Sequence, residues 1–260
     1  MDRVHLDIRS QWRQRYETPQ QVASRLSELL KAFAEIDPKL GRWFKRSMKK
    51  PTLEPLFPTN PVISDVEQAV RAGAQFKDTT PPESWPERGY AVAGWNGAPD
   101  GEPSAAFTLR IGAIHEKLAA FNRFEITLSD AAGSASLLSA ENVERMIAAI
   151  VANLEPSVLD VATRKWLHGA PAEFDLACPA GGWMSYVRNG DGREFEVPDG
   201  ISSMPMADGV LLLSTPEQDS DSDPNHVRGA YLLNQALATV REFENDFAVR
   251  RAPSSFGTAV

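Results

Sequence analysis

Cysteine is almost absent from this 260-residue sequence, in which Cys178 stands alone. One cysteine cannot form an intramolecular disulfide, and it cannot complete a four-ligand zinc site with histidines that lie far apart along the chain. We therefore predict a protein of a reducing compartment, the cytoplasm, that folds without disulfides or metal ions.

Long apolar runs are missing as well. The most apolar stretches, residues 147–154 and 210–213, are far shorter than the ~20 residues of a membrane-spanning helix. The first ten residues carry charges at Asp2, Arg3, Asp7 and Arg9, where an export signal needs an apolar segment. Neither membrane insertion nor export is expected.

The short motifs of familiar enzyme classes are missing too. The sequence contains no phosphate-binding G-x-x-x-x-G-K-[ST] loop, no dinucleotide-binding G-x-G-x-x-G segment and no G-x-S-x-G nucleophile motif. A zinc-protease motif begins at His115 and Glu116 but has Ala119 where the second histidine ligand is required. We predict no catalytic residues and no cofactor, although a carboxylate-only active site would leave no short motif.

A calcium-binding loop is suggested by residues 219–223 (DSDSD), which place carboxylates at its first, third and fifth positions. The sixth position of such a loop needs a glycine and the twelfth a bidentate glutamate, but Pro224 and Ala230 occupy them. We interpret the segment as a solvated acidic loop that ends in a helix N-cap, not as a metal site.

Charge is abundant but unevenly distributed. The chain has 35 acidic and 27 basic residues, a net charge of −8, which favours a basic partner over a nucleic-acid backbone. Residues 1–50 are an exception, with 12 basic and 6 acidic residues, and we interpret their basic cluster at 39–50 as a solvated surface. The acidic excess concentrates between Asp191 and Asp223, where nine acidic residues accompany one base, Arg193.

Hydrophobic periodicity and capping residues predict helices. Thr18 and Ser139 are N-cap residues, and each precedes an apolar stripe with a period of 3.6 residues. We expect helices over residues 18–36, 139–154 and 223–250, the last being the longest, with a shorter helix after Pro61.

An alternation of apolar and polar residues predicts strands around residues 4–8, 90–92, 107–111 and 124–128, with further candidates at 157–166, 183–188 and 210–214. Because polar residues alternate with apolar ones, one face of the sheet should be in contact with water. The predicted fold is α+β, with a largely antiparallel sheet and several helices packed on it. We expect a single domain over residues 1–250 and a flexible tail over 251–260.

Four segments together carry a resemblance to a known family. They are residues 34–44 (AEIDPKLGRWF), 91–97 (AVAGWNG), 181–188 (GGWMSYVR) and 209–213, which lead through an acidic loop to 223–227 (DPNHV). In this order and spacing the chain resembles the immunity protein 52 family of bacterial polymorphic toxin systems, over about residues 3–240.

The resemblance implies an α+β protein that is not an enzyme and that neutralises a toxin encoded beside it. It implies that the toxin is a restriction-endonuclease-like nuclease, in many cases delivered by a type VI secretion system. No catalytic residue or cofactor site carries over. The implied partner is the toxin, for example a DNase domain, and neither nucleic acid nor a membrane is bound directly.

The acidic stretch is the candidate toxin interface. A nuclease cleft must be basic to hold phosphates, so an inhibitor gains from acidic side chains that steer its association. Two alternatives stay open: the acids only keep a loop soluble, or inhibition acts away from the active site. The candidate residues are Asp191, Glu194, Glu196, Asp199, Glu217, Asp219, Asp221 and Asp223.

Two other functions compete with an inhibitor. An enzyme with a carboxylate-based site would turn over a substrate and lose that activity when one acid is changed. An adaptor of a secretion apparatus would co-purify with apparatus components rather than with a toxin. The neighbouring gene discriminates between them, because a gene with a C-terminal toxin domain supports the inhibitor alone.

Overall fold

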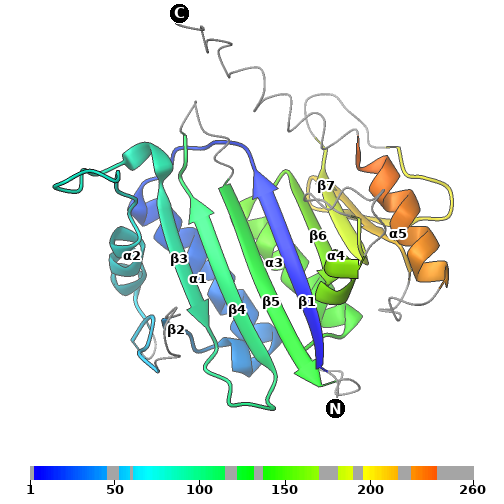
Figure 1. Cartoon of the computed structure of the whole chain (residues 1–260), viewed down its shortest axis with the longest axis horizontal. Coiled ribbons are helices and arrows are strands. Elements are labelled where there is room, and N and C mark those ends of the chain that lie inside the picture. Colours follow the sequence, from blue (N-terminus) through cyan, green and yellow to red (C-terminus); the bar gives the residue numbers. More distant parts are fainter. Residues whose placement is uncertain are drawn as a thin grey trace, which may run out of the picture.

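A single antiparallel β-sheet organises the molecule (Figure 1). The computed structural model describes residues 3–45, 53–58, 61–114, 122–131, 137–169, 181–189, 196–215 and 224–238. Within these ranges the sheet has nine strands in the order β2-β3-β4-β5-β1-β6-β7-β9-β8. The strands are β1 (Arg3–Trp12), β2 (Phe44–Lys45), β3 (Tyr90–Trp95), β4 (Ser104–Ile111), β5 (Asn122–Ala131), β6 (Val158–Thr163), β7 (Met184–Arg188), β8 (Ser202–Met206) and β9 (Gly209–Leu213). The predicted α+β class is confirmed.

The first strand lies at the centre of the sheet and shows why these residues form strands. It pairs with β5 on one side and with β6 on the other. Every second residue from Leu6 to Trp12 points to one face and is buried, whereas Asp7, Arg9 and Gln11 between them are partly exposed. This period of two is the one that the sequence predicts for a half-buried strand.

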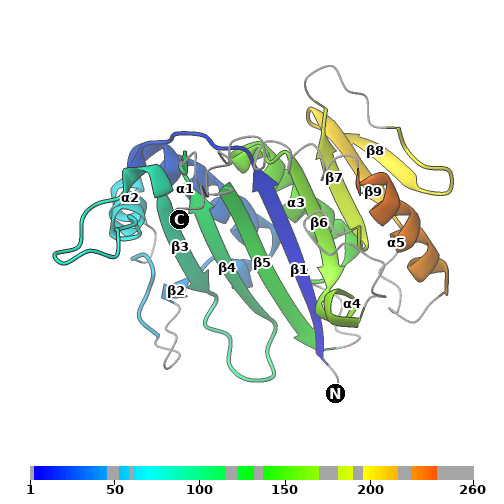
Figure 2. The same ribbon diagram turned by 45° about the horizontal axis from the view of Figure 1, so that its top comes forward.

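Two long helices cover the inner face of the sheet, α1 (Pro19–Ile36) and α3 (Ala140–Leu154), with α2 (Ile63–Ala72) beside α1 (Figures 1 and 2). The predicted start of α1 is confirmed: the Gln21 amide donates to the Thr18 hydroxyl at 3.3 Å, and the Thr18 amide donates to the Gln21 side chain at 2.9 Å. Such a capping box stabilises a helix by about 1 kcal/mol. Between helices and sheet, Phe33 packs on Phe124 in the main core.

Two further helices, α4 (Arg164–Gly169) and α5 (Pro224–Ala236), lie on the outer face over β6, β7 and β9 (Figure 1). Leu233 and Leu237 of the α5 segment pack with Val187 and Leu212 of the sheet. A third small core joins Trp166 of α4 to Ala162 and Ala230. The sheet is therefore covered on both faces at this end.

Three predicted boundaries need comment. The helix expected to be longest begins at Pro224 as predicted, but its described part has 13 residues against 18 in α1, and residues beyond 238, with the expected tail, lie outside the described residues. The strand expected over 157–166 ends at Thr163, because the chain turns into α4. The edge strand β8 was not predicted, since SSMPM has no apolar alternation and contains a proline, which an edge strand tolerates.

Candidate functional site

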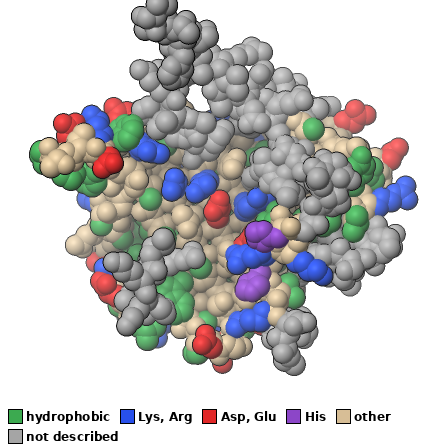
Figure 3. All heavy atoms as spheres, viewed as in Figure 1, with side chains coloured by type: hydrophobic (Ala, Val, Ile, Leu, Met, Phe, Trp, Pro, Cys, Tyr) green, Lys and Arg blue, Asp and Glu red, His purple; other side chains and the backbone are tan. Residues whose placement is uncertain are grey.

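Within the described residues, the main group of outward-facing charged side chains lies on the outer face of β3, β4, β5 and β1. No described helix lies over β3, β4 and β5; α4 packs beside β1, and α5 sits over the other end of the sheet (Figures 1 and 2). Figure 3 shows Lys and Arg side chains gathered on this face, with acidic and histidine side chains among them. The strand register assigns to it Arg3, His5, Asp7 and Arg9 of β1, Arg110 of β4, and Arg123 and Glu125 of β5, with Asp160 of β6 at its border.

The border is formed by an ion pair between Arg9 and Asp160. The Arg9 Nε–H donates to Asp160 Oδ1 at 3.1 Å, and Arg9 Nη2 contacts the second carboxylate oxygen. Asp160 has no exposed side-chain surface. A buried carboxylate needs such a bidentate partner, because leaving it unpaired would destabilise the fold strongly. The pair therefore holds β1 against β6, at the end of the sheet that α4 and α5 cover.

A second polar group joins β1, β5 and α4. The Thr127 hydroxyl donates to Asp7 Oδ1 at 2.5 Å, and Arg164 Nη2 donates to the same oxygen at 3.2 Å. His5 is nearby, and its pKa lies below the usual value because burial, and then the positive charges of Arg164 and Arg3, disfavour the imidazolium. We therefore expect His5 to be neutral near pH 7.

Two arginines lie directly opposite each other on this face. The register pairs Arg110 of β4 with Arg123 of β5. Arg123 Nη1 lies 3.6 Å from a carboxylate oxygen of Glu125, and both side chains are more than a third exposed. Arg110 is exposed, and no described residue forms an ion pair with it. These two positive charges are thus set against a single ion pair in the described chain, the one between Arg123 and Glu125.

The predicted acidic candidates lie at the other end of the sheet. Glu196 and Asp199 are exposed and precede β8. The remaining candidates, Asp191, Glu194, Glu217, Asp219, Asp221 and Asp223, lie outside the described residues.

Asp208, in the β8–β9 turn, belongs to the same acidic stretch but is held by neighbours. The Tyr186 hydroxyl donates to Asp208 Oδ1 at 2.8 Å, and the Arg188 Nε–H donates to Oδ2 at 2.5 Å. Burial, followed by the Asp208 hydrogen bond, raises the pKa of Tyr186. Burial also acts to raise the pKa of Asp208, but hydrogen bonds from Tyr186 and Arg188 outweigh it, so that pKa is lowered. Asp208 is thus an ionised structural acceptor.

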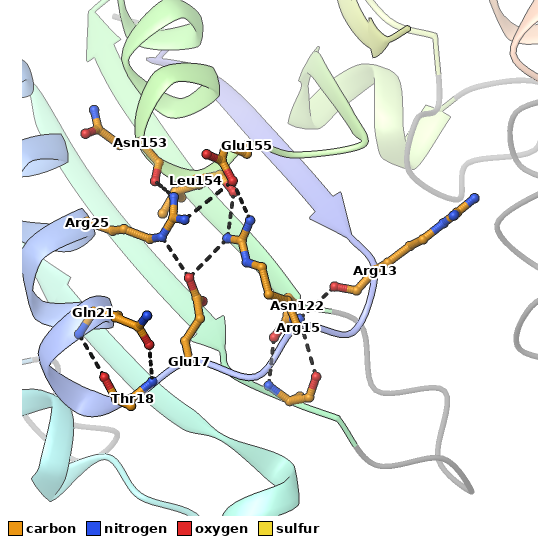
Figure 4. A network of polar contacts seen from close by, with 11 residues as sticks. Arg13, Arg15, Glu17, Thr18, Gln21, Arg25, Asn122, Asn153, Leu154 and Glu155 are labelled. Atoms are coloured by element: carbon orange, nitrogen blue, oxygen red, sulfur yellow. Dashed lines mark hydrogen bonds and ion pairs between the residues drawn. The ribbon is translucent and has the colours of Figure 1, made fainter. Parts of the chain in front are cut away.

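A third charge network lies in the loop between β1 and α1 (Figure 4). Glu17 is nearly buried and accepts ion pairs from Arg25 Nε at 2.7 Å and Arg15 Nη2 at 3.3 Å. Both arginines also reach Glu155, and they donate to carbonyl oxygens of the last residues of α3. Burial raises the pKa of Glu17, although the two arginines oppose it. Cations at a helix C-terminus are stabilising, so this network joins the loop to the end of α3.

The described residues indicate neither a metal site nor a membrane-spanning helix. No group of three His, Cys, Asp or Glu side chains among these residues is arranged to hold a metal ion. No described helix combines the length and the apolar character that crossing a membrane requires.

Comparison with known proteins identifies the family. A profile described as immunity protein 52 matches residues 8–241. The chain belongs to the immunity protein 52 family. No curated protein matches it significantly. Among solved structures it is similar to the Pseudomonas aeruginosa T6SS protein PA0821, at 11% sequence identity and a TM-score of 0.48, with 90% of this chain and 72% of that chain covered.

The motifs behind the resemblance to the immunity protein 52 family shape the fold. Trp43 is buried and packs edge-on against Phe107, with ring centroids 4.9 Å apart. Gly182 lies so close to β6 that a Cβ atom there would stand 2.6 Å from the Val161 carbonyl oxygen. Trp183 is also buried. These motif residues are therefore structural.

The arginines of the outer face are residues that sequence reasoning did not single out. Their signal was the polar alternation at Arg110, Arg123 and Glu125, which predicted a solvated face of the sheet but no particular site. The antiparallel register is what brings the two arginines together across 12 intervening residues.

Proposed function

We propose that this member of the immunity protein 52 family binds and neutralises a cognate toxin encoded beside it. The observation that carries the proposal is the family match, which extends over residues 8–241. The protein would act in the cytoplasm as a stoichiometric inhibitor, not as an enzyme, through an interface of about 1,600 Å² in total.

The proposed toxin is a nuclease, delivered by a type VI secretion system. Charge supports a nuclease: the chain has a net charge of −8, and nine of its acids lie between Asp191 and Asp223. A cleft that holds phosphates is basic, so an acidic surface would both accelerate association and compete with nucleic acid for the cleft.

The proposed contact region for the basic cleft is this acidic stretch. Its described members Glu196 and Asp199 are exposed at the β8 edge of the sheet. Asp208 is excluded from the proposed contact, because Tyr186 and Arg188 already occupy its carboxylate.

Co-expression tests the function itself. The full chain would be produced together with the toxin domain encoded immediately upstream, and cell survival and the stoichiometry of the purified pair would be measured. Survival with a tight complex of defined stoichiometry is expected. Absence of both rescue and complex would overturn the proposal and return attention to an enzyme or an adaptor.

Charge neutralisation tests the acidic contact. Glu217→Gln, Asp219→Asn and Asp221→Asn together should weaken toxin binding and flatten its dependence on salt, because steering charges are lost. A matched control removes three exposed acids elsewhere, at Glu28, Asp78 and Glu141. If both triple variants retained the affinity and salt dependence of the natural chain, the acidic stretch would not be the interface.

A further inference from the structure

Arg110 and Arg123 form a like-charge pair on the outer face of the sheet. Residues directly opposite in antiparallel strands have Cβ atoms about 4.5–5.5 Å apart, and like charges there destabilise the sheet. The ion pair between Arg123 and Glu125 is long, at 3.6 Å, and the buried Arg123 Nε–H has no acceptor among the described residues. No described residue pairs with Arg110. The repulsion within the pair therefore opposes folding of the free protein, and within the described chain only the long ion pair of Arg123 with Glu125 offsets it.

The surrounding surface has the same sign. The arginine surface, defined as Arg3, Arg9, Arg110, Arg123 and Arg164 with their neighbours, sets five arginines against the three carboxylates of Asp7, Glu125 and Asp160. This is a positive region on a chain whose net charge is −8. Of the described helices, only α4, which carries Arg164, packs beside this surface (Figure 1).

The charge pattern fits a protein better than a nucleic acid. Carboxylates are interleaved with the arginines, since Arg9 stands opposite Glu125 on one side and Asp160 on the other. A phosphate backbone would meet these carboxylates and be repelled, whereas an acidic polypeptide segment can place its own carboxylates on the guanidinium groups alone. Planar guanidinium groups bind carboxylates with two parallel hydrogen bonds, which adds orientation to attraction.

The geometry points to the Arg110–Arg123 pair as a docking site for an acidic segment of the cognate toxin. This inference rests on the proposed function and adds a second contact of opposite charge to it. Acidic residues lie at the β8 end of the sheet and the arginine pair lies on β4 and β5. The toxin would therefore contact one negatively charged and one positively charged region. Such an arrangement selects one orientation of the partner and disfavours others.

The test compares two full-length double variants by calorimetric titration with the toxin domain encoded immediately upstream, at low and high salt. Arg110→Gln with Arg123→Gln removes the pair. Lys31→Gln with Arg145→Gln removes the same charge from exposed positions of α1 and α3, which cover the opposite face. Each protein would also be titrated with a short DNA duplex and unfolded in urea.

The pair variant should bind the toxin at least about tenfold more weakly at low salt, and the control within about twofold of the natural chain. Its urea midpoint should equal or exceed that of the natural chain, which separates lost contact from lost folding. Equal toxin affinity in the natural chain and the pair variant would overturn the docking site while leaving the inhibitor function intact. If the natural chain and the control bound the DNA duplex but the pair variant did not, the surface would be assigned to nucleic acid instead. A natural chain that binds no toxin would overturn both proposals.

Discussion

The two halves of the outer face of the sheet share the same alternation of inward and outward side chains, but they differ in the residues that point outward. Over β6, β7 and β9 most outward residues, such as Val187 and Leu212, are apolar and lie beneath α4 and α5. Over β4, β5 and β1 they are mostly polar or charged, and of the described helices only α4 packs beside them, against β1. Strands buried on both faces have nearly continuous apolar sequence, and every residue of β6 is buried.

This difference separates folding from recognition. The covered half contributes hydrophobic burial on both sides of the sheet, at about 25 cal/mol per Å² of apolar surface. The open half contributes burial on its inner side only, so its outward side chains are available for contacts. Substitutions in the covered half should therefore change stability, and those in the open half should change binding.

The largest effect is expected at the border between the halves. Arg9→Met removes the bidentate guanidinium partner of Asp160, whose side chain is fully buried, and should destabilise the protein by about 4 kcal/mol because the buried carboxylate loses this cation. Urea unfolding measures the change. Arg9→Met combined with Asp160→Leu should recover part of the lost stability. If Arg9→Met alone were as stable as the natural chain, the border pair would be dispensable.

A slightly smaller loss is expected inside the covered half. Leu233→Ala deletes a fully buried side chain that packs with Val187 and Leu212, and should lower the free energy of unfolding by about 3 kcal/mol. Thr108→Ala on the open half is the control, with an expected change below about 0.5 kcal/mol. Similar losses at the two positions would remove the distinction between the halves.

On the open half, removing a charge should stabilise the protein. Arg110→Gln relieves the repulsion with Arg123 and should raise the free energy of unfolding by about 0.5 kcal/mol. In a background that already carries Arg123→Gln the same substitution should give no gain. Equal effects in the two backgrounds, measured by a double-mutant cycle, would show that the two arginines do not interact.

The smallest effect concerns pH. The pKa of His5 is lowered by burial, Arg164 and Arg3, against the opposing effect of Asp7. The unfolded chain therefore binds this proton at a higher pH, so the His5 contribution is complete above about pH 6.5 and is lost as pH falls through the folded pKa. The natural chain should lose slightly more stability than His5→Gln between pH 7 and pH 5. Parallel pH profiles would contradict this.

Much of the fold follows from local sequence patterns. The capping box at Thr18, the N-cap at Ser139 and the alternation in β1 each predict an element that the structure contains. The turn from β6 into α4 was missed, because Arg164 to Trp166 continue the strand-like composition of the segment before them. Propensity alone cannot place that boundary, since packing of Trp166 against Ala230 decides it.

The amino-acid sequence is sufficient to infer the fold class, the family, the solvated sheet face and the strongly acidic stretch, because periodicity, capping and charge are properties of neighbouring residues. The covered half of the outer face and the pairing of Arg110 with Arg123 become visible in the folded chain alone. Both depend on strand order and register, which bring distant residues within a few ångströms. No pattern within a single segment predicts such a contact.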